Sequence, residues 1–465
     1  MAVNDRATAR RYWLTTLGCP KSEVDSEKLV TLLAAEGLTA ADGPESAELV
    51  VVNTCAFIDA ARQESIDTIL AMQDAAAPGA QVVVTGCMAQ RYEAELADAL
   101  DDVVVAPFGV EFWGAAQAAA APSGPTSSPT PIALAAPTRR SAGRSLVPTF
   151  DLLNLPRARS ARPWAYVKIA EGCDRACGFC AIPSFRGPQR SRTVSSIVEE
   201  IDTLCVNEIV LVAQDLARYG KDRLGRPEGA GDLADLLAAA SSRVDWVRLL
   251  YLYPSDLDDS LIDSIASSAV PYFDLSLQHV SRPLLHKMRR WGSGEVFRER
   301  IERIRELAPD ATLRSNFIVG YPGESEDDHE ALVQFVSDVG LDWCGFFVYS
   351  REEGTYAASL PDVVPPAVMN DRLAELRDIQ ESITFQRRAQ RVGTVQRVLV
   401  DEPGIARSAG EAPEIDGVIH VPQSLAVGAF HDVRIVECLG VDLQAVASSS
   451  REGSTESAAL APRVG

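Results

Sequence analysis

The chain has 465 residues, of which 46% are hydrophobic and 23% are charged, a composition typical of globular proteins. Its formal net charge is −21. Because nucleic-acid affinity depends mainly on Lys and Arg side chains that neutralise phosphates, this charge disfavours a nucleic-acid partner and favours a basic one. Solubility alone is the other interpretation of the same charge.

The length and the N-terminus indicate a multidomain cytoplasmic protein. At about 150 residues per domain, the chain has room for about three domains. It contains no run of about 18 apolar residues, and its first residues, MAVNDRATARRYW, lack the apolar core of a signal peptide, so we expect no membrane association. Cytoplasmic thiols stay reduced. The nine cysteines therefore indicate ligation, catalysis or burial instead of a disulfide framework.

The first domain, expected over residues 11–114, alternates short apolar strands with helical stretches. This alternation predicts a parallel α/β sheet. The strands are expected at Tyr12–Leu17, Glu48–Asn53, Gln81–Thr85 and Asp102–Val105.

Three cysteines lie near the ends of these strands. Cys19, Cys55 and Cys87 each come just after one of the first three strands. Ligands of open α/β sheets bind beyond the carboxyl ends of the strands, so we expect these three thiols to converge on one face.

A segment rich in Ala, Pro and Ser follows and is expected to be a linker over residues 115–160. Around its end lies an arginine cluster that includes Arg157, Arg159 and Arg162. Such a cluster usually forms a solvated face, although it could also bind an anion.

A second domain is expected over residues 161–391. Six strand–helix units predict an incomplete (βα)6 barrel, whose reactive groups should lie at the carboxyl ends of its strands. A long helix should close the domain, from about Pro365 to Arg391. The six strands are expected at Ala165–Ile169, Glu208–Val212, Val247–Leu252, Tyr272–Leu277, Leu313–Val319 and Cys344–Tyr349.

The last domain, expected over residues 392–447, has short alternating strands separated by Gly and Pro. This pattern predicts a small β-barrel. Residues 448–465 are expected to form a disordered tail.

The first strand of the second domain is followed directly by EGCDRACGFCAIP, in which Cys173, Cys177 and Cys180 have C-x3-C-x2-C spacing. Structural zinc normally has four protein ligands, and no fourth Cys or His lies nearby. A 4Fe-4S cluster held by three thiolates instead keeps one iron open for another ligand. The open iron could bind S-adenosylmethionine and reduce its sulfonium, with the cofactor supplying the radical chemistry.

This spacing resembles the radical S-adenosylmethionine superfamily, and other segments resemble it too. The resemblance implies that Phe179 lies near the adenine. It implies the same for NFIVGYPGE, which contains Ile318 and Gly320. It also implies that Gln214 and Asp215, in VAQDLARYG, contact the methionine part of the cofactor.

The two cysteine trios, a radical domain and a TRAM-like barrel together resemble the methylthiotransferases. The family resemblance implies a second 4Fe-4S cluster on Cys19, Cys55 and Cys87, whose open iron holds the inserted sulfur. Short sequence segments such as TLGCPKSEVDSE, CAIPSFRG and AQDLARYG are similar to those of the RimO branch of this family, which modifies a ribosomal protein. The MiaB branch modifies transfer RNA. The remaining cysteines, Cys205, Cys344 and Cys438, are expected in the core.

We therefore expect a methylthiotransferase that modifies the β-carbon of an aspartate in the small-subunit ribosomal protein S-twelve. The resemblance implies two molecules of S-adenosylmethionine per turnover, an external electron donor and a sulfur source. Residues 391–447 carry four arginines against eight carboxylates, which suits a basic protein substrate and no stable nucleic-acid binding. The alternatives are a MiaB-like enzyme acting on transfer RNA adenosine and a non-catalytic iron-sulfur carrier.

Overall fold

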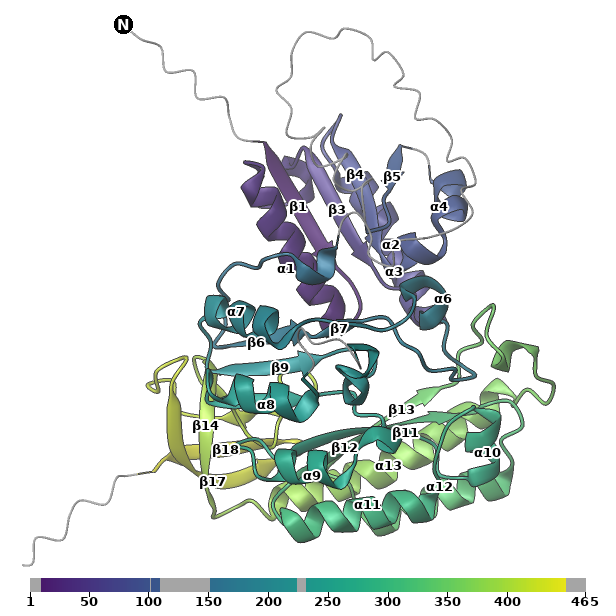
Figure 1. Cartoon of the computed structure of the whole chain (residues 1–465), viewed down its shortest axis with the longest axis vertical. Helices are drawn as coiled ribbons and strands as arrows, with labels where there is room; N and C mark the ends of the chain where they lie inside the picture. The colour runs from purple at the N-terminus through teal and green to yellow at the C-terminus, as the bar shows by residue number, and fades with distance from the viewer. Residues whose placement is uncertain (1–9, 101, 109–150, 224–230, 449–465) are drawn as a thin grey trace, which may run out of the picture.

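The computed structural model describes residues 10–100, 102–108, 151–223 and 231–448. Most of the predicted linker and the tail from residue 449 onward lie outside these ranges. The N-terminal sheet sits over one side of a larger α/β body, and the C-terminal strands pack against another side of that body (Figure 1). The fold class predicted from the sequence is confirmed.

The N-terminal block is a parallel five-stranded sheet in the order β2-β1-β3-β4-β5. Its central strand β3 is buried along its whole length, as expected for a parallel strand covered on both faces. The edge strand β2 was not predicted, because two exposed residues leave no periodic signal. The strands are β1 (Arg11–Thr16), β2 (Thr39–Ala40), β3 (Leu49–Thr54), β4 (Gln81–Gly86) and β5 (Val103–Val105); the helices are α1 (Pro20–Ala35), α2 (Asp59–Ala75), α3 (Cys87–Arg91) and α4 (Glu93–Ala99).

The second block contains six parallel barrel strands. They form two three-stranded sheets, β10-β9-β6 and β11-β12-β13, which a parallel bridge between Leu252 and Leu275 connects. The barrel strands are β6 (Trp164–Lys168), β9 (Glu208–Val212), β10 (Trp246–Leu249), β11 (Tyr272–Gln278), β12 (Thr312–Val319) and β13 (Trp343–Val348). The short strands β7 (Ala170–Glu171) and β8 (Arg190–Ser191) pair with each other beside β6.

Amphipathic helices cover the outside of the barrel. Several begin with a side-chain cap: Ser325 and Asp328 form a capping box at α12, which satisfies backbone donors that the first helical turn leaves free. The helices are α6 (Ile182–Arg186), α7 (Val194–Leu204), α8 (Leu233–Ser241), α9 (Asp259–Ala266), α10 (Arg282–Lys287), α11 (Gly294–Leu307), α12 (Glu326–Val339) and α13 (Pro366–Ala389).

The C-terminal strands close into a small barrel in the order β14-β15-β16-β18-β17. A buried ion pair fixes it to the larger barrel: Glu208 lies 2.8 Å from both Arg248 and Arg407. The strands are β14 (Val395–Glu402), β15 (Ile405–Ser408), β16 (Ile419–His420), β17 (Phe430–Leu439) and β18 (Asp442–Ala447). Among the described helices, none is long and apolar enough to cross a membrane.

Candidate active site

The predicted cluster loop lies between β7 and α6, just beyond the carboxyl end of the first barrel strand. It holds Cys173, Cys177 and Cys180. Gly172 precedes the loop with φ +81°, and a Cβ there would lie 2.2 Å from the carbonyl oxygen of Pro188. Only glycine allows so close a backbone approach, so the loop is held tightly against the chain that follows α6.

Two basic residues donate to sulfur atoms of this loop. The backbone N–H of Arg175 lies 3.4 Å from Cys173 Sγ, and Arg290 Nη1 lies 3.4 Å from Cys177 Sγ. Burial raises the pKa of Cys173 to about 11 and that of Cys180 to about 12, because the interior disfavours a thiolate. These thiols are therefore protonated until a metal displaces their protons.

The other trio lies at one edge of the N-terminal sheet. Cys19, Cys55 and Cys87 follow β1, β3 and β4, which are neighbours in the sheet. Gly18 has φ +106°, and a Cβ there would lie 3.1 Å from Cys55 Sγ; Gly86 has φ +95°, and its Cβ would lie 2.4 Å from a side-chain oxygen. Gly18 thus leaves the space beside Cys55 open, and Gly86 allows Asn53 and the backbone of Thr54 to approach closely.

The electrostatic environment differs within this trio. Burial raises the pKa of Cys55 to about 11. Burial is the largest influence on Cys19 and by itself would raise its pKa, but the ammonium of Lys21 and the hydrogen bonds from Ser22 and the backbone N–H of Lys21 together outweigh it, so the pKa of Cys19 is lowered.

All six proposed ligands are thiols, the donor set that 4Fe-4S clusters use. Within the described ranges, no three His, Cys, Asp or Glu side chains converge as ligands of a single metal ion would. A cluster does not require such convergence, because each thiolate binds a different iron atom and the thiolates therefore lie further apart. The residues present fit a cluster at each trio.

A series of side-chain contacts connects the N-terminal trio to the barrel. Arg186 Nη2 lies 2.9 Å from Cys87 Sγ, and Arg186 Nη1 lies 3.2 Å from Glu171 Oε2. Gln214 Nε2 donates to Glu171 Oε1 at 2.6 Å. Lys168 also donates to Glu171, at 2.7 Å. Arg186 therefore links the N-terminal sheet to a residue predicted to contact the cofactor.

The residues of this contact series stabilise one another's charged forms. Burial alone would raise the pKa of Glu171, but Arg186 and Lys168 hold it well below its usual range. Burial alone would lower the pKa of Arg186, but Cys87 and Glu171 raise it well above its usual value. Both side chains are thus charged at the domain interface. The sequence did not single them out, although both belong to the motifs that carry the family resemblance.

Gln214 and Asp215 lie directly beyond β9. Asp215 Oδ2 accepts from Arg175 Nε at 2.6 Å, which brings it to the cluster loop. Gln214 Oε1 and Asp215 Oδ1 are buried without a hydrogen-bond partner in the described part of the chain. Buried acceptors normally have a partner, so these atoms fit contacts to a bound polar ligand.

The other predicted cofactor contacts are more dispersed. Phe179 and Ile318 are partly buried against the barrel core. Gly320 has φ +81° and donates to the carboxylate of Glu324. Its neighbour Tyr321 reaches the cluster loop, since a Cβ at Gly178 would lie 2.8 Å from the Tyr321 hydroxyl.

Lys21 was missed by the sequence reasoning, although it stands two residues after Cys19. Its Nζ lies 3.9 Å from the ring centroid of Tyr251, a residue just beyond β10 with φ +67°. Burial would lower the pKa of Lys21, but Cys19 and Tyr251 raise it. No carboxylate lies within ion-pair distance of its ammonium in the described ranges, whereas Lys28 and Lys168 both have one.

A second contact holds the N-terminal block to the barrel. The buried Glu352, between β13 and α13, accepts from Arg91 Nη1 at 2.7 Å and also from Arg62. Both arginines belong to the N-terminal block. One carboxylate therefore neutralises two cations across the interface.

The arginine cluster and one cysteine differ from the prediction. Arg157 is buried and pairs with Glu200 at 3.0 Å, so it is not part of a solvated face. Cys205 is exposed, because it ends α7 with φ +53°. Cys344 and Cys438 are partly buried.

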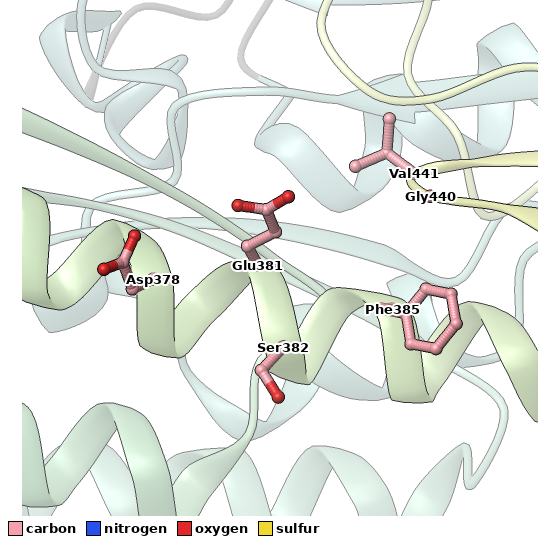
Figure 2. A pocket seen from close by; sticks show the side chains of 6 residues that line it. All are labelled: Asp378, Glu381, Ser382, Phe385, Gly440 and Val441. Carbon is pink, nitrogen blue, oxygen red and sulfur yellow. The ribbon is translucent and has the colours of Figure 1, made fainter.

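Among the surface cavities formed by the described residues, two lie outside the trios. One, of about 430 Å³, lies between α13 and the turn from β17 to β18, and both Glu381 and Phe385 line it (Figure 2). The other, of about 540 Å³, is lined by Arg290 and its neighbours. Only the second reaches a contact of the cluster loop, since Arg290 touches Cys177.

Comparisons with known families match the three blocks in order. Residues 11–106 match the Uncharacterized protein family UPF0004, residues 167–336 the Radical SAM superfamily and residues 392–447 the TRAM domain. This combination defines a radical S-adenosylmethionine enzyme.

Several curated relatives carry the same name. "Ribosomal protein uS12 methylthiotransferase RimO" of Moorella thermoacetica is 40% identical over 88% of this chain and 93% of its own length. The protein of the same name from Saccharopolyspora erythraea is 40% identical over 94% and 95%, respectively. The chain therefore belongs to the RimO family of methylthiotransferases.

A solved structure of the radical S-adenosylmethionine methyltransferase TsrM from Kitasatospora setae, with cobalamin and a 4Fe-4S cluster bound, is 15% identical. The match covers 90% of this chain and 80% of the TsrM chain, with a TM-score of 0.48.

Proposed function

We propose that the chain inserts a methylthio group at the β-carbon of an aspartate in ribosomal protein uS12. The main support is the pair of cysteine trios at the carboxyl ends of two parallel sheets, joined by the contact of Arg186 with Cys87. Family membership supports the substrate, because the curated relatives are named for uS12.

The unactivated C–H bond explains why radical chemistry is needed, since such a carbon has no pKa that a side-chain base could use. When bound, a 4Fe-4S cluster with S-adenosylmethionine supplies a one-electron cleavage whose radical product abstracts hydrogen from such carbons. Cys173, Cys177 and Cys180 would hold that cluster. A second cluster on the other trio would carry the sulfur. One molecule of S-adenosylmethionine would donate its methyl group to that sulfur and another would supply the radical, so that two molecules would be consumed per product.

The chain's own residues would bind and orient the reactants. Gln214 and Asp215 offer free buried oxygens beside the loop, while Phe179, Ile318 and Gly320 would face the adenosine part. No carboxylate of the described ranges lies within ion-pair distance of Lys21, although Glu171 and the thiols of Cys19 and Cys87 act on it over a longer range. We assign Lys21 to the carboxylate of the substrate aspartate. A lysine ammonium can hold a carboxylate while its β-carbon reacts.

The surface of the C-terminal barrel also suits a basic substrate. Many of its charges are internal, such as Arg407 with Asp401. The exposed charges are two arginines against four carboxylates: Arg397 and Arg434, and Glu402, Glu414, Asp432 and Glu437. This acidic surface would orient a basic ribosomal protein.

Mass spectrometry of uS12 and of transfer RNA tests the proposal. Each is incubated anaerobically with reconstituted enzyme, reductant, sulfide and S-adenosylmethionine. A methylthio mass gain on one aspartate of uS12 is expected. A gain on transfer RNA alone would contradict the substrate, and a gain on neither would favour a non-catalytic iron-sulfur carrier.

Two variants separate the proposed clusters. Cys177→Ala should abolish formation of 5′-deoxyadenosine, and formation at the wild-type rate would contradict the radical site. Cys55→Ala should retain that cleavage but form no methylthiolated product. Product from this variant would contradict the role of the N-terminal trio.

A further inference from the structure

A concentrated basic patch stands out on this acidic chain. We define the basic patch as Lys287, Arg289 and Arg290, which lie in the segment RPLLHKMRRW from residue 282 to 291 and line one surface cavity. That segment contains no acidic residue, although the whole chain has a net charge of −21. The cavity of about 540 Å³ opens here and is lined by His286, Lys287, Arg289, Arg290, Trp291 and Tyr356.

The basic patch lies directly against the cluster loop. Arg290 Nη1 is 3.4 Å from Cys177 Sγ. The backbone N–H of Gly178 donates to the carbonyl of Met288 at 2.8 Å, so the loop and the patch segment share a hydrogen bond. A protein bound at the patch would therefore lie one side chain away from the Cys173, Cys177 and Cys180 trio.

The outer part of the patch is built for contact. Arg289 has φ +54°, a left-handed conformation that favours glycine. Its guanidinium stacks 3.9 Å from the ring centroid of Tyr356. Trp291 beside it is 41% exposed. Exposed aromatic and arginine side chains are enriched at the centres of protein interfaces, and strained residues are concentrated at functional sites.

We propose that the basic patch docks an acidic protein that carries single electrons and reduces the cluster of this trio. The inference rests on the proposed cluster. One electron leaves the reduced carrier, which is oxidised by one electron, and reduces the cluster; no bond is formed and no proton moves. Complementary charge would align the carrier's redox centre with Cys177 and raise the association rate.

Stopped-flow reduction of the reconstituted full-length protein tests this assignment. The donors are a reduced acidic flavodoxin and, separately, photoreduced deazariboflavin, a small donor without net charge. The variants are Arg289→Glu and Arg289→Gly, of which the second removes the charge and also relieves the backbone strain. Arg303→Glu on α11 is the matched control, because Arg303 is also exposed, with 44% of its side chain accessible.

We expect Arg289→Glu to slow reduction by flavodoxin about tenfold at low salt, with a weaker dependence on salt, and Arg289→Gly to slow it less. Reduction by deazariboflavin should not change, and Arg303→Glu should resemble the wild type. Unchanged reduction by flavodoxin would overturn the proposal. So would equal slowing with both donors, which would mean that the patch acts on the cluster and not on docking.

Three further results keep this inference separate from the proposed function. If Arg289→Glu instead loses affinity for ribosomal RNA while its reduction by flavodoxin is unchanged, the patch is a nucleic-acid contact and the proposal is wrong. If the wild type assembles no cluster on the trio, the proposed function fails as well. If the wild type modifies uS12 and Arg289→Glu accepts electrons normally, only the docking proposal fails.

Discussion

Glu352 is the residue whose replacement should separate radical formation from sulfur transfer. Its carboxylate is 2% exposed and accepts from Arg91 and Arg62 of the N-terminal block. Glu352→Gln keeps the shape but leaves two arginines without their shared charge. Breaking a buried ion pair costs about 3–5 kcal/mol. The lower end applies, because Arg62 is 18% exposed and keeps Asp59 at 2.7 Å.

This cost falls on the docking of the two blocks, because the partners belong to different blocks. About 3 kcal/mol corresponds to roughly a hundredfold change in the docking equilibrium. We therefore expect Glu352→Gln to form 5′-deoxyadenosine at close to the wild-type rate but to yield severalfold less methylthiolated uS12 for each molecule formed.

The assay is the ratio of the two products, measured by liquid chromatography and mass spectrometry in the same reaction. Glu353→Gln is the matched control, because it makes the same change of charge at the neighbouring residue. The side chain of Glu353 is exposed, and its contact with Arg91 is made by its backbone carbonyl. Hydrogen exchange should show lost protection at the interface in Glu352→Gln. An unchanged product ratio despite that loss, or an equal effect in Glu353→Gln, would refute the reasoning.

Three further predictions address recognition, pH dependence and stability. Lys21→Gln should weaken binding of uS12 at least about tenfold. In titrations without S-adenosylmethionine, the wild type should bind uS12 more tightly than a uS12 variant with asparagine in place of the substrate aspartate, and Lys21→Gln should bind the two equally. A preference for aspartate that Lys21→Gln retains would contradict the role of Lys21. Burial raises the pKa of Asp416 to about 6, so its protonated form stabilises the fold, and this contribution is lost as pH rises from about 4 through 6. Asp416→Asn should remove that part of the pH dependence in urea unfolding, and an unchanged profile would contradict it. Glu208→Ala should lower the free energy of unfolding by about 3 kcal/mol, because Arg248 and Arg407 lose a buried partner; a loss below about 1 kcal/mol in denaturant titration would show that the remaining acceptors suffice.

The strand pattern by itself was enough to predict the fold class. Buried strands such as Leu49–Thr54 and Glu208–Val212 can be predicted from the local hydrophobicity of the sequence. The alternation of such strands with helices predicts parallel sheets. The short strand Thr39–Ala40 was missed, since two exposed residues carry no period. The exposure of Cys205 was also missed, because a helix end depends on one backbone angle and not on composition.

The cysteine spacing likewise indicated candidate ligands and the kind of chemistry, because cluster loops are local in sequence. The residues that surround those thiols were decided by tertiary structure. Arg186 meets Cys87 across 99 positions, and Arg91 meets Glu352 across 261. Sequence periodicity reports only neighbours on one helix or strand, whereas these charges lie together because two different sheets place the carboxyl ends of their strands against each other.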